Sequence, residues 1–352
     1  MQGKFYLQTV EGLEKLAAKE VRSLDPGLKV QSYPGGYVQI SGDIDPESLL
    51  ELKIPEDVFY LLYESDGITR SRSSLGEIHN AVIRGEAFAQ GVALRRAISR
   101  KWPKRVTYRV IARKEGRHNF NRSDLATAIY SAVDTRTNGR WRVVDSNANV
   151  EFWVTVRDTH CVIGVRLSDR TMRHRTYKTQ HLEASLRPTV AHALVTLTQP
   201  KDDDVFCDPM CGAGTILIER GMWGRYRQLL GGDINPEAVE AAKGNIGPRF
   251  KPIEVKHWDA TDLPLDSGSI TAMAVNLPFG RKIGTPQEMQ TLYPAFLKEA
   301  ARVLEPGARL VVLTDQDQLF RRSLQDLPFY TEERVPVKIL GHSSLILACR
   351  RI

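Results

Sequence analysis

The sequence has few cysteines and no long apolar run. Its four cysteines lie far apart in 352 residues, at Cys161, Cys207, Cys211 and Cys349, and this scatter is unlike a disulfide framework. Three residues separate Cys207 from Cys211 and no second pair exists, so the spacing does not predict a zinc site. No apolar stretch approaches the roughly 20 residues that cross a bilayer. We therefore expect no disulfide, no metal and no membrane span.

The first residues also lack the apolar core of a signal peptide. They read MQGKFYLQTVEGLEK, which predicts a mature, cytoplasmic protein. Hydrophobic residues make up 42% of the chain and charged residues 26%, which is ordinary for a soluble globular protein. The length predicts two or three domains with enough chain for a hydrophobic core.

Positive charge is concentrated in one segment. Residues 84–122 contain twelve Lys or Arg against two Glu, so this segment has a net charge of +10. The whole chain has a net charge of +7, so the rest of the chain is negative. Trp102, Tyr108, His118 and Phe120 are interspersed with these cations. A solvated face is the alternative interpretation, but cations mixed with aromatic rings are typical of a nucleic-acid-binding surface.

Hydrophobic periodicity divides the chain into four consecutive parts. Residues 1–65 alternate short strands and helices, which indicates a ferredoxin-like α+β domain. Residues 66–168 form a second α+β unit, in which Ser123 is expected to cap a helix. Residues 169–180 are basic, have little apolar periodicity and are expected to be a linker. Residues 181–352 alternate strands and helices and end in an antiparallel pair, which predicts an α/β Rossmann-like fold with a seven-stranded, mostly parallel sheet.

A glycine-rich turn lies inside the C-terminal part. The stretch Val205–Glu219, VFCDPMCGAGTILIE, reads as a strand, an acid, a turn with Gly212 and Gly214, and a helix start. Asp233 ends the next strand, where an acid binds ribose hydroxyls. The third glycine of the dinucleotide fingerprint is absent, and Asp208 would repel a pyrophosphate but attract a cationic amino-acid group. The pattern therefore predicts a nucleotide-type cofactor other than NAD.

The sequence NLPFG follows the fourth strand of the predicted sheet. Asn276 Oδ1 and the Leu277 carbonyl can each accept one proton of an –NH2 group, and Phe279 can stack on the ring that carries it. The alternative interpretation is a turn at the end of a strand, where Asn and Pro are common. Its position after the glycine-rich turn and Asp233 favours an amine-binding site at the ligand-facing edge.

Several segments of the chain resemble a known family. DPMCGAGT, GGDINPEAV, HWDATDLP and NLPFG resemble the motifs of class I S-adenosylmethionine-dependent methyltransferases that modify exocyclic amines. HLEASLRPTVAHALV resembles the opening helix of the RNA guanine-N2 members. RKEGRHNFNRSDLATAI and VVDSNANVEFWVTV resemble a THUMP domain. The whole chain is similar in architecture to the TrmN-like tRNA (guanine-N2-)-methyltransferases.

Two positions depart from the family patterns. Leu277 replaces the first proline of the (D/N)-P-P-(F/Y) motif, a variant that is associated with the tRNA guanine enzymes. The stretch Asn147-Ala148-Asn149 lacks the proline that is usual in the late turn of a THUMP domain.

The resemblance implies S-adenosylmethionine as the cofactor. Asp208 would lie near its methionine end, Asp233 would bind the ribose hydroxyls and Asp259 would bind the adenine amine. Arg187 and Thr189 would help to close the pocket. The complete implied set of cofactor residues is Arg187, Thr189, Asp208, Met210, Gly212, Gly214, Thr215, Asp233, Ile234, Asp259, Ala260 and Asn276. The implied catalytic set is Asn276, Leu277, Pro278 and Phe279.

The resemblance also implies a substrate. The reaction would transfer a methyl group to the exocyclic N2 of a guanosine in the tRNA acceptor stem, at position 6, and a monomer would bind the acceptor stem and the 3′ end. The implied RNA contacts are Arg105, Arg113, Lys114, Arg117 and His118. No strong base is visible near NLPFG, so positioning of the amine is the expected catalytic contribution. The alternatives are ribosomal RNA, another tRNA position, a protein glutamine, or a catalytically inactive RNA-binding protein.

Overall fold

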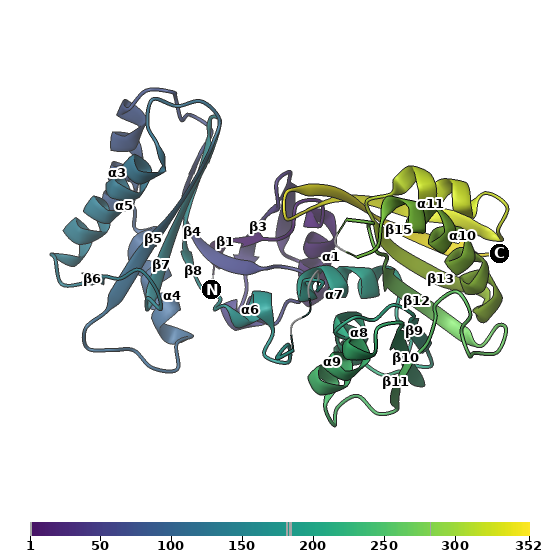
Figure 1. Cartoon of the computed structure of the whole chain (residues 1–352). Helices are drawn as coiled ribbons and strands as arrows, with labels where there is room; N and C mark the ends of the chain where they lie inside the picture. The colour runs from purple at the N-terminus through teal and green to yellow at the C-terminus, as the bar shows by residue number, and fades with distance from the viewer. Residues whose placement is uncertain (1, 181, 183–184, 282) are drawn as a thin grey trace.

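Two β-sheets with helices packed against them make up most of the part of the chain that the structure describes (Figure 1). The computed structural model describes residues 2–180, 182, 185–281 and 283–352. His181, the expected first residue of the C-terminal domain, lies outside the described residues, so this boundary stays a prediction. Within the described ranges, no helix combines the length and apolar character needed to cross a membrane.

The two N-terminal units share one sheet. Strand β4 pairs with β8 in antiparallel register, with Phe59 opposite Arg166, so the hydrogen bonding continues across the expected boundary at residue 65. The eight strands described for this sheet lie in the order β2-β3-β1-β4-β8-β7-β5-β6. Their bounds are Gln2–Gln8 (β1), Lys29–Tyr33 (β2), Tyr37–Asp43 (β3), Asp57–Ser65 (β4), Thr107–Glu115 (β5), Arg142–Val143 (β6), Val150–Arg157 (β7) and His160–Arg166 (β8). The two units are therefore joined edge to edge as one layer.

Helices cover one face of the β5–β8 half of this sheet. The helices of the N-terminal half are Glu14–Leu24 (α1), Pro46–Leu50 (α2), Ser73–Arg84 (α3), Ala87–Ala97 (α4) and Arg122–Thr137 (α5). In β7, Phe152 is buried in the same cluster as side chains of α3 and α5, whereas Trp153 belongs to a separate cluster on the opposite face. In that second cluster Tyr6 stacks on Phe59, with ring centroids 4.5 Å apart. We call the face that carries Trp153 the open face.

The start of α5 differs from the expectation. Asn121 is its N-cap, not Ser123. The Asn121 side chain accepts a hydrogen bond from the Asp124 N–H, and the Asp124 carboxylate accepts one from the Asn121 N–H. This reciprocal capping box satisfies two backbone donors at once, so the helix begins one residue before Ser123.

The C-terminal sheet has the expected α/β architecture. Its described strands lie in the order β11-β10-β9-β12-β13-β15-β14, and β15 runs antiparallel to both of its neighbours. The strand bounds are Val205–Asp208 (β9), Gln228–Asp233 (β10), Ile253–His257 (β11), Ile270–Asn276 (β12), Leu304–Thr314 (β13), Phe329–Ile339 (β14) and His342–Arg351 (β15). The helix bounds are Pro188–Leu197 (α7), Thr215–Trp223 (α8), Pro236–Ile246 (α9), Pro286–Val303 (α10) and Asp317–Leu324 (α11). The strand order reverses between β9 and β12, which places a ligand crevice at their carboxyl ends.

Residues 169–180 are packed against both halves, although we expected a linker. They include the short helix α6, Thr171–His174. The Arg175 guanidinium donates to the Lys53 carbonyl at 2.7 Å and lies 3.4 Å from Glu219. The Tyr177 hydroxyl donates to the same Glu219 at 2.6 Å. Met172 and Tyr177 of this segment are also buried in the hydrophobic cluster shared by both halves, but two apolar side chains five residues apart give no helix or strand period that would predict this docking.

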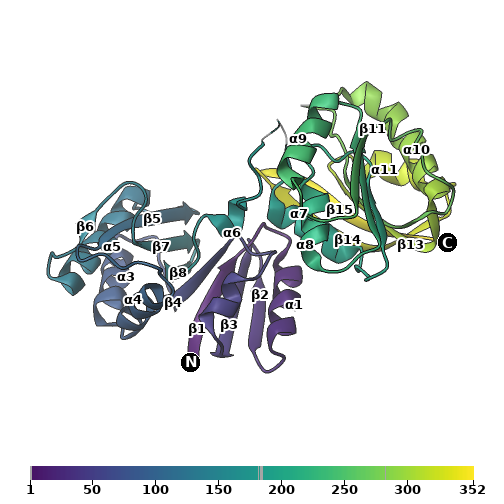
Figure 2. The same ribbon diagram turned by 90° about the horizontal axis from the view of Figure 1, so that it is seen from below.

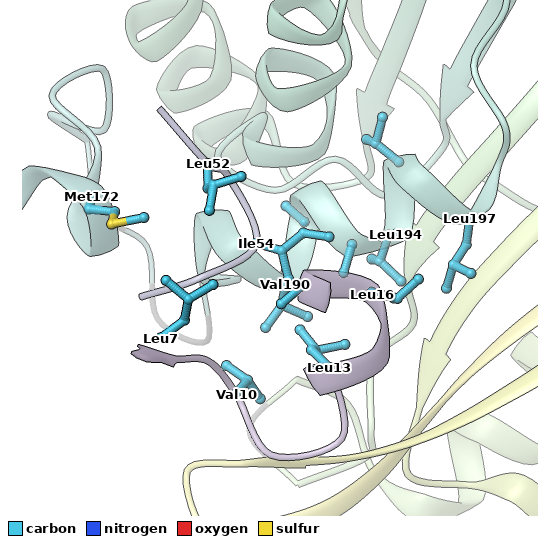
Figure 3. Close-up of a cluster of buried hydrophobic side chains, with 14 of the residues drawn as sticks. Leu7, Val10, Leu13, Leu16, Leu52, Ile54, Met172, Val190, Leu194 and Leu197 are labelled. Atoms are coloured by element: carbon cyan, nitrogen blue, oxygen red, sulfur yellow. The ribbon is translucent and has the colours of Figure 1, made fainter. Parts of the chain in front are cut away.

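A hydrophobic cluster joins the N-terminal sheet to the C-terminal domain (Figure 3). Leu13 and Leu16 from the α1 region share this cluster with Val190 and Leu194 from α7. Burial of each such side chain contributes about 1.5–3 kcal/mol. Figure 2 shows strands β1 to β3 between the β5–β8 region and the C-terminal domain. The molecule is therefore elongated, with its middle part packed tightly on the C-terminal domain.

Candidate cofactor and amine-binding site

The side chains of the candidate site come from the carboxyl ends of neighbouring strands. Strands β9 and β10 pair in parallel, with Gly231 opposite Asp208, and Asp233 ends β10. Strands β12 and β13 also pair in parallel, with Asn276 opposite Leu313. Parallel pairing brings all of these ends to the same edge of the sheet, where open α/β folds bind ligands.

The glycine-rich turn leaves space beside Asp233. Gly212 and Gly214 have φ of 51° and 76°, a left-handed conformation that favours glycine. A Cβ on Gly214 would approach Ala242 to 3.1 Å, whereas a Cβ on Gly212 would meet nothing within 4 Å. The Asp233 carboxylate accepts hydrogen bonds from the N–H groups of Gly212 at 2.9 Å and Asn235 at 3.0 Å. Each carboxylate oxygen keeps a lone pair, so Asp233 can still accept two ribose hydroxyls.

Asp208 is a fully buried acid whose carboxylate has no hydrogen-bond partner among the described residues. It is 0% exposed. Burial and, to a smaller extent, the nearby charge of Asp233 raise the pKa of Asp208 well above its usual range. The Met210 N–H lowers this pKa only in part, and it does not lie in hydrogen-bond geometry with the Asp208 carboxylate. A buried carboxylate of this kind is stabilised by a cation. The site therefore fits a ligand with an ammonium group.

The amine motif is held by its backbone and leaves its side-chain oxygen free. The Pro278 carbonyl accepts from the Tyr293 hydroxyl at 2.9 Å, and the Phe279 carbonyl accepts from Gln316 Nε2 at 3.2 Å. Burial raises the pKa of Tyr293 to about 12, so its hydroxyl remains a donor. Asn276 Oδ1 is buried and has no hydrogen-bond partner in the described part of the chain. This arrangement fits a ligand that brings an amine proton to Asn276.

Sequence reasoning missed the residues that support this motif. Tyr293 lies in the middle of α10, and Gln316 lies just after β13. Asp315 also follows β13, and its carboxylate lies beside the motif, although no strong base was expected there. The signal that identified Asn276, a polar residue at the end of a buried parallel strand, applies equally to Thr314-Asp315.

The remaining predicted cofactor residues have varied surroundings. Arg187 directly precedes α7 and donates to Glu56 of the N-terminal half at 2.8 Å, while the buried Thr189 hydroxyl has no partner among the described residues. Asp259 accepts from the N–H and hydroxyl of Thr261 at 2.8 and 2.7 Å. Ile234, next to Asp233, is 67% exposed. The others are Met210, which is partly exposed, and Thr215 and Ala260, which are buried. Their cofactor roles stay predictions.

The predicted RNA contacts do not form one surface. Arg113 and Lys114 are successive residues of β5 and therefore point to opposite faces. Arg113 lies on the open face, over the Trp153 ring at 4.5 Å, and burial lowers its pKa. Lys114 instead donates to the Gly116 carbonyl at 2.8 Å. The other three predicted contacts lie in the segments that flank β5, where Arg105 and Arg117 are exposed and His118 is half-buried.

A chain of ion pairs crosses the open face and ends beside α7. It alternates positive and negative side chains from four strands, the residue before β4, α6 and the residue before α7. In order, its members are Arg109, Glu151, Arg166, Asp57, Arg173, Glu56 and Arg187. Although burial opposes it, hydrogen bonds from Trp153 and the charges of Arg166 and Arg109 lower the pKa of Glu151. This ion-pair chain connects the cationic sheet to the wall of the C-terminal domain.

No metal site is formed by the residues that the structure describes. Within residues 2–180, 182, 185–281 and 283–352, no three His, Cys, Asp or Glu side chains come together as metal ligands.

Comparisons with known proteins match both halves of the chain. Residues 175–344 match the RMKL-like methyltransferase domain, and residues 93–166 match the THUMP domain. The tRNA (guanine(6)-N(2))-methyltransferase THUMP3 of Bos taurus is 31% identical over 64% of this chain and 47% of that protein. The chain thus spans about half the length of such mammalian relatives.

Other relatives match over nearly their whole length. The tRNA (guanine(6)-N2)-methyltransferase of Methanocaldococcus jannaschii is 25% identical over 96% of this chain and 97% of that protein. The crystal structure of TrmN from Thermus thermophilus superposes with a TM-score of 0.82 at 25% identity, and covers 99% of both chains. These similarities extend across both sheets.

Proposed function

Because the chain joins a THUMP domain to an RMKL-like methyltransferase domain, we propose that it methylates the exocyclic N2 of a guanosine in tRNA with S-adenosylmethionine. The observation that carries this proposal is the pair of buried acceptors at neighbouring strand ends, Asp208 and Asn276, which have no partners among the described residues. One fits an ammonium group and the other fits an amine proton. A methyl donor with an amino-acid end and an amine acceptor meet both requirements.

Some residues of the site would bind the cofactor, and others would position the guanine amine. Bound S-adenosylmethionine supplies an electrophilic methyl group. Asp208 would bind its ammonium group, Asp233 its ribose hydroxyls and Asp259 its adenine amine. Asn276 Oδ1 and the Leu277 carbonyl would accept the two N2 protons of guanine, and Phe279 would stack on the base after it leaves its helix. This orientation directs the nitrogen lone pair toward the donor, so positioning is the main catalytic contribution.

We further propose guanosine 6 of the acceptor stem as the target. Relatives that match over nine-tenths or more of this chain and of their own length are named tRNA (guanine(6)-N2)-methyltransferases. A cavity of about 570 Å³ lies on the open face, and Tyr33, Tyr37, Arg157 and His160 are among its lining residues. Aromatic rings and cations suit an unstacked nucleotide, which supports capture of the 3′ end there. A cytoplasmic monomer completes this proposal, since one chain supplies both the RNA-binding sheet and the site.

The test is direct mapping of the product. The full chain is incubated with labelled S-adenosylmethionine and unmodified total RNA, and the labelled nucleotide is identified. We expect N2-methylguanosine at position 6 of tRNA, and no label in a transcript with adenosine at that position. Label in ribosomal RNA or at another tRNA position would replace the target, and cofactor binding without any transfer would favour an inactive RNA-binding protein.

A further inference from the structure

Asp315 lies beside the amine motif and has one buried oxygen without a hydrogen bond. Its side chain is only 3% exposed, although it follows directly after β13. Oδ1 accepts from Gln316 Nε2 at 3.1 Å, and the same nitrogen donates to the Phe279 carbonyl at 3.2 Å. Oδ2 lies 3.0 Å from Arg281 Nη2, but not in hydrogen-bond geometry, and has no other partner in the described ranges.

Three neighbouring strands therefore end in the same way. Asp208 at the end of β9, Asn276 at the end of β12 and Asp315 directly after β13 each present a buried acceptor oxygen that lacks a hydrogen bond among the described residues. Each of these oxygens has lost its hydrogen bonds to water on burial, and a ligand proton can replace them. The proposed function assigns Asp208 to the cofactor and Asn276 to the amine. Asp315 has no assigned partner.

The amine motif cannot by itself select guanine. Guanine N2 and adenine N6 are both –NH2 groups, and Asn276 with the Leu277 carbonyl would accept protons from either. The next ring position separates the two bases. In guanine the amine is followed by N1–H, a donor, and then by O6, an acceptor, whereas in adenine the position next to the amine is an N1 acceptor. A site that prefers guanine needs an acceptor next to Asn276 and then a donor.

We propose that Asp315 and Arg281 supply this acceptor and donor and so read the Watson–Crick edge of the flipped guanine. Asp315 Oδ2 accepts the N1–H, while the Arg281 guanidinium donates to O6. The Arg281 side chain is 59% exposed and can shift from Asp315 to the base without leaving its neighbourhood. Adenine would place its N1 lone pair against the Asp315 carboxylate. The inference rests on the proposed function, because it names the group that selects the base at that same site.

The test uses tRNA in which the target guanosine is replaced by 2-aminopurine. This base keeps the 2-amine but lacks both N1–H and O6. We expect the wild-type kcat/KM to fall by about 100-fold or more, because a site built to bond a polar group rejects analogues that lack it. The variant is Asp315→Asn. Since Gln316 Nε2 holds an oxygen at the Oδ1 position, the amide nitrogen takes the Oδ2 position and becomes a donor. Asp315→Asn should therefore lose activity on guanosine and gain activity on 2-aminopurine. The ratio of kcat/KM on guanosine to kcat/KM on 2-aminopurine should fall by about 100-fold relative to the wild type.

Controls separate the base-reading role from a structural one. Comparing the ratio of kcat/KM on the two substrates between variant and wild type cancels the different reactivity of their amines. Asp317→Asn, two residues away and paired with Arg334 on the surface, should leave the ratio unchanged. Asn276→Ala should slow both substrates alike. If Asp315→Asn does not fold, as judged by its thermal unfolding and cofactor affinity, Arg281→Ala takes its place and should lose activity on guanosine but not on 2-aminopurine.

The outcomes distinguish the two proposals. If the wild type methylates both substrates equally, or if Asp315→Asn and Arg281→Ala each lower both by the same factor, Asp315 does not read the base. If the wild type methylates neither substrate, the proposed function itself fails. A preference for guanosine that narrows in the Asp315 variant supports both.

Discussion

Buried carboxylates on the open face of the N-terminal sheet have different surroundings from those at the carboxyl edge of the C-terminal sheet. On the open face of the N-terminal sheet, Glu56, Asp57 and Glu151 each have cationic partners in the ion-pair chain. At the carboxyl edge of the C-terminal sheet, Asp208 and Asp315 keep oxygens without hydrogen bonds from any described residue. Paired charges fix the position of the elements that carry them, because removing one leaves the other buried and unpaired. Acceptor oxygens without a hydrogen bond remain available for a ligand. The comparison predicts that substitutions in the first set alter stability and those in the second alter binding or turnover.

The largest effect is expected from the unpaired Asn276. Asn276→Ala removes an acceptor that orients the amine, so turnover should fall by about 100-fold or more while cofactor affinity is nearly unchanged. The measurement is single-turnover methylation of tRNA together with calorimetric titration of S-adenosylmethionine. Asn276→Asp keeps an acceptor oxygen and should recover part of the rate. Normal turnover by Asn276→Ala would remove the amine-binding role.

A matched pair of substitutions tests the comparison itself. Glu151→Gln removes the charge that Arg109 and Arg166 share, and hydrogen bonds to charged groups contribute about 1.5–3 kcal/mol each. The free energy of unfolding of the Glu151→Gln variant should be lower than that of the wild type by about 1.5–3 kcal/mol at neutral pH, as measured by denaturant titration. Asp208→Asn removes a buried acid without a hydrogen bond and should leave stability unchanged or increased, while cofactor affinity falls. Equal destabilisation by both variants would contradict the distinction.

The pKa shifts of these two acids predict opposite pH effects on stability. The pKa of Glu151 is lowered in the folded state, so its stabilisation is present above its unfolded pKa and is lost as the pH falls through the folded pKa. The pKa of Asp208 is raised, so its ionisation opposes folding increasingly as the pH rises from its unfolded toward its folded value. A cation at Asp208 reverses that penalty. Cofactor affinity should therefore rise with pH by up to about tenfold per unit, and Asp208→Asn should abolish this dependence. Equal slopes for wild type and variant would exclude Asp208 as the ammonium partner.

The smallest effect is expected on the open face. Arg113→Gln should weaken tRNA binding and reduce the slope of log affinity against log salt by about one, the value for one phosphate contact. Lys114→Gln is the matched control, because Lys114 points to the other face of β5 and should change the slope less. Filter binding over a range of salt concentrations measures both. Equal effects of the two variants would show that RNA does not distinguish the faces.

The sequence predicted those parts of the site that are recognisable from the residues next to them in the chain. The glycine-rich turn follows a buried strand, Asp233 and Asn276 each end one, and the alternation of strands and helices sets their order. The parts that it did not predict depend on contacts between distant residues. Arg187 and Glu56 are 131 residues apart, and neither has a neighbour in sequence that indicates the other. Asp315 is one of 42 acids, and the pairing of β12 with β13 brings it to the same sheet edge as Asn276.

The hydrophobic cluster between α1 and α7 has a consequence for synthesis on the ribosome. Helix α1 ends at Leu24, but α7, which contributes Val190 and Leu194 to the same cluster, begins only at Pro188. At about 5–20 residues per second, the apolar side of the nascent N-terminal unit waits roughly 10–30 seconds for its cover. The N-terminal sheet can close by Arg166, yet it still exposes Leu13 and Leu16 until α7 emerges. Transiently exposed apolar surface of this kind favours aggregation, so we expect the nascent chain to be most prone to aggregate during this interval.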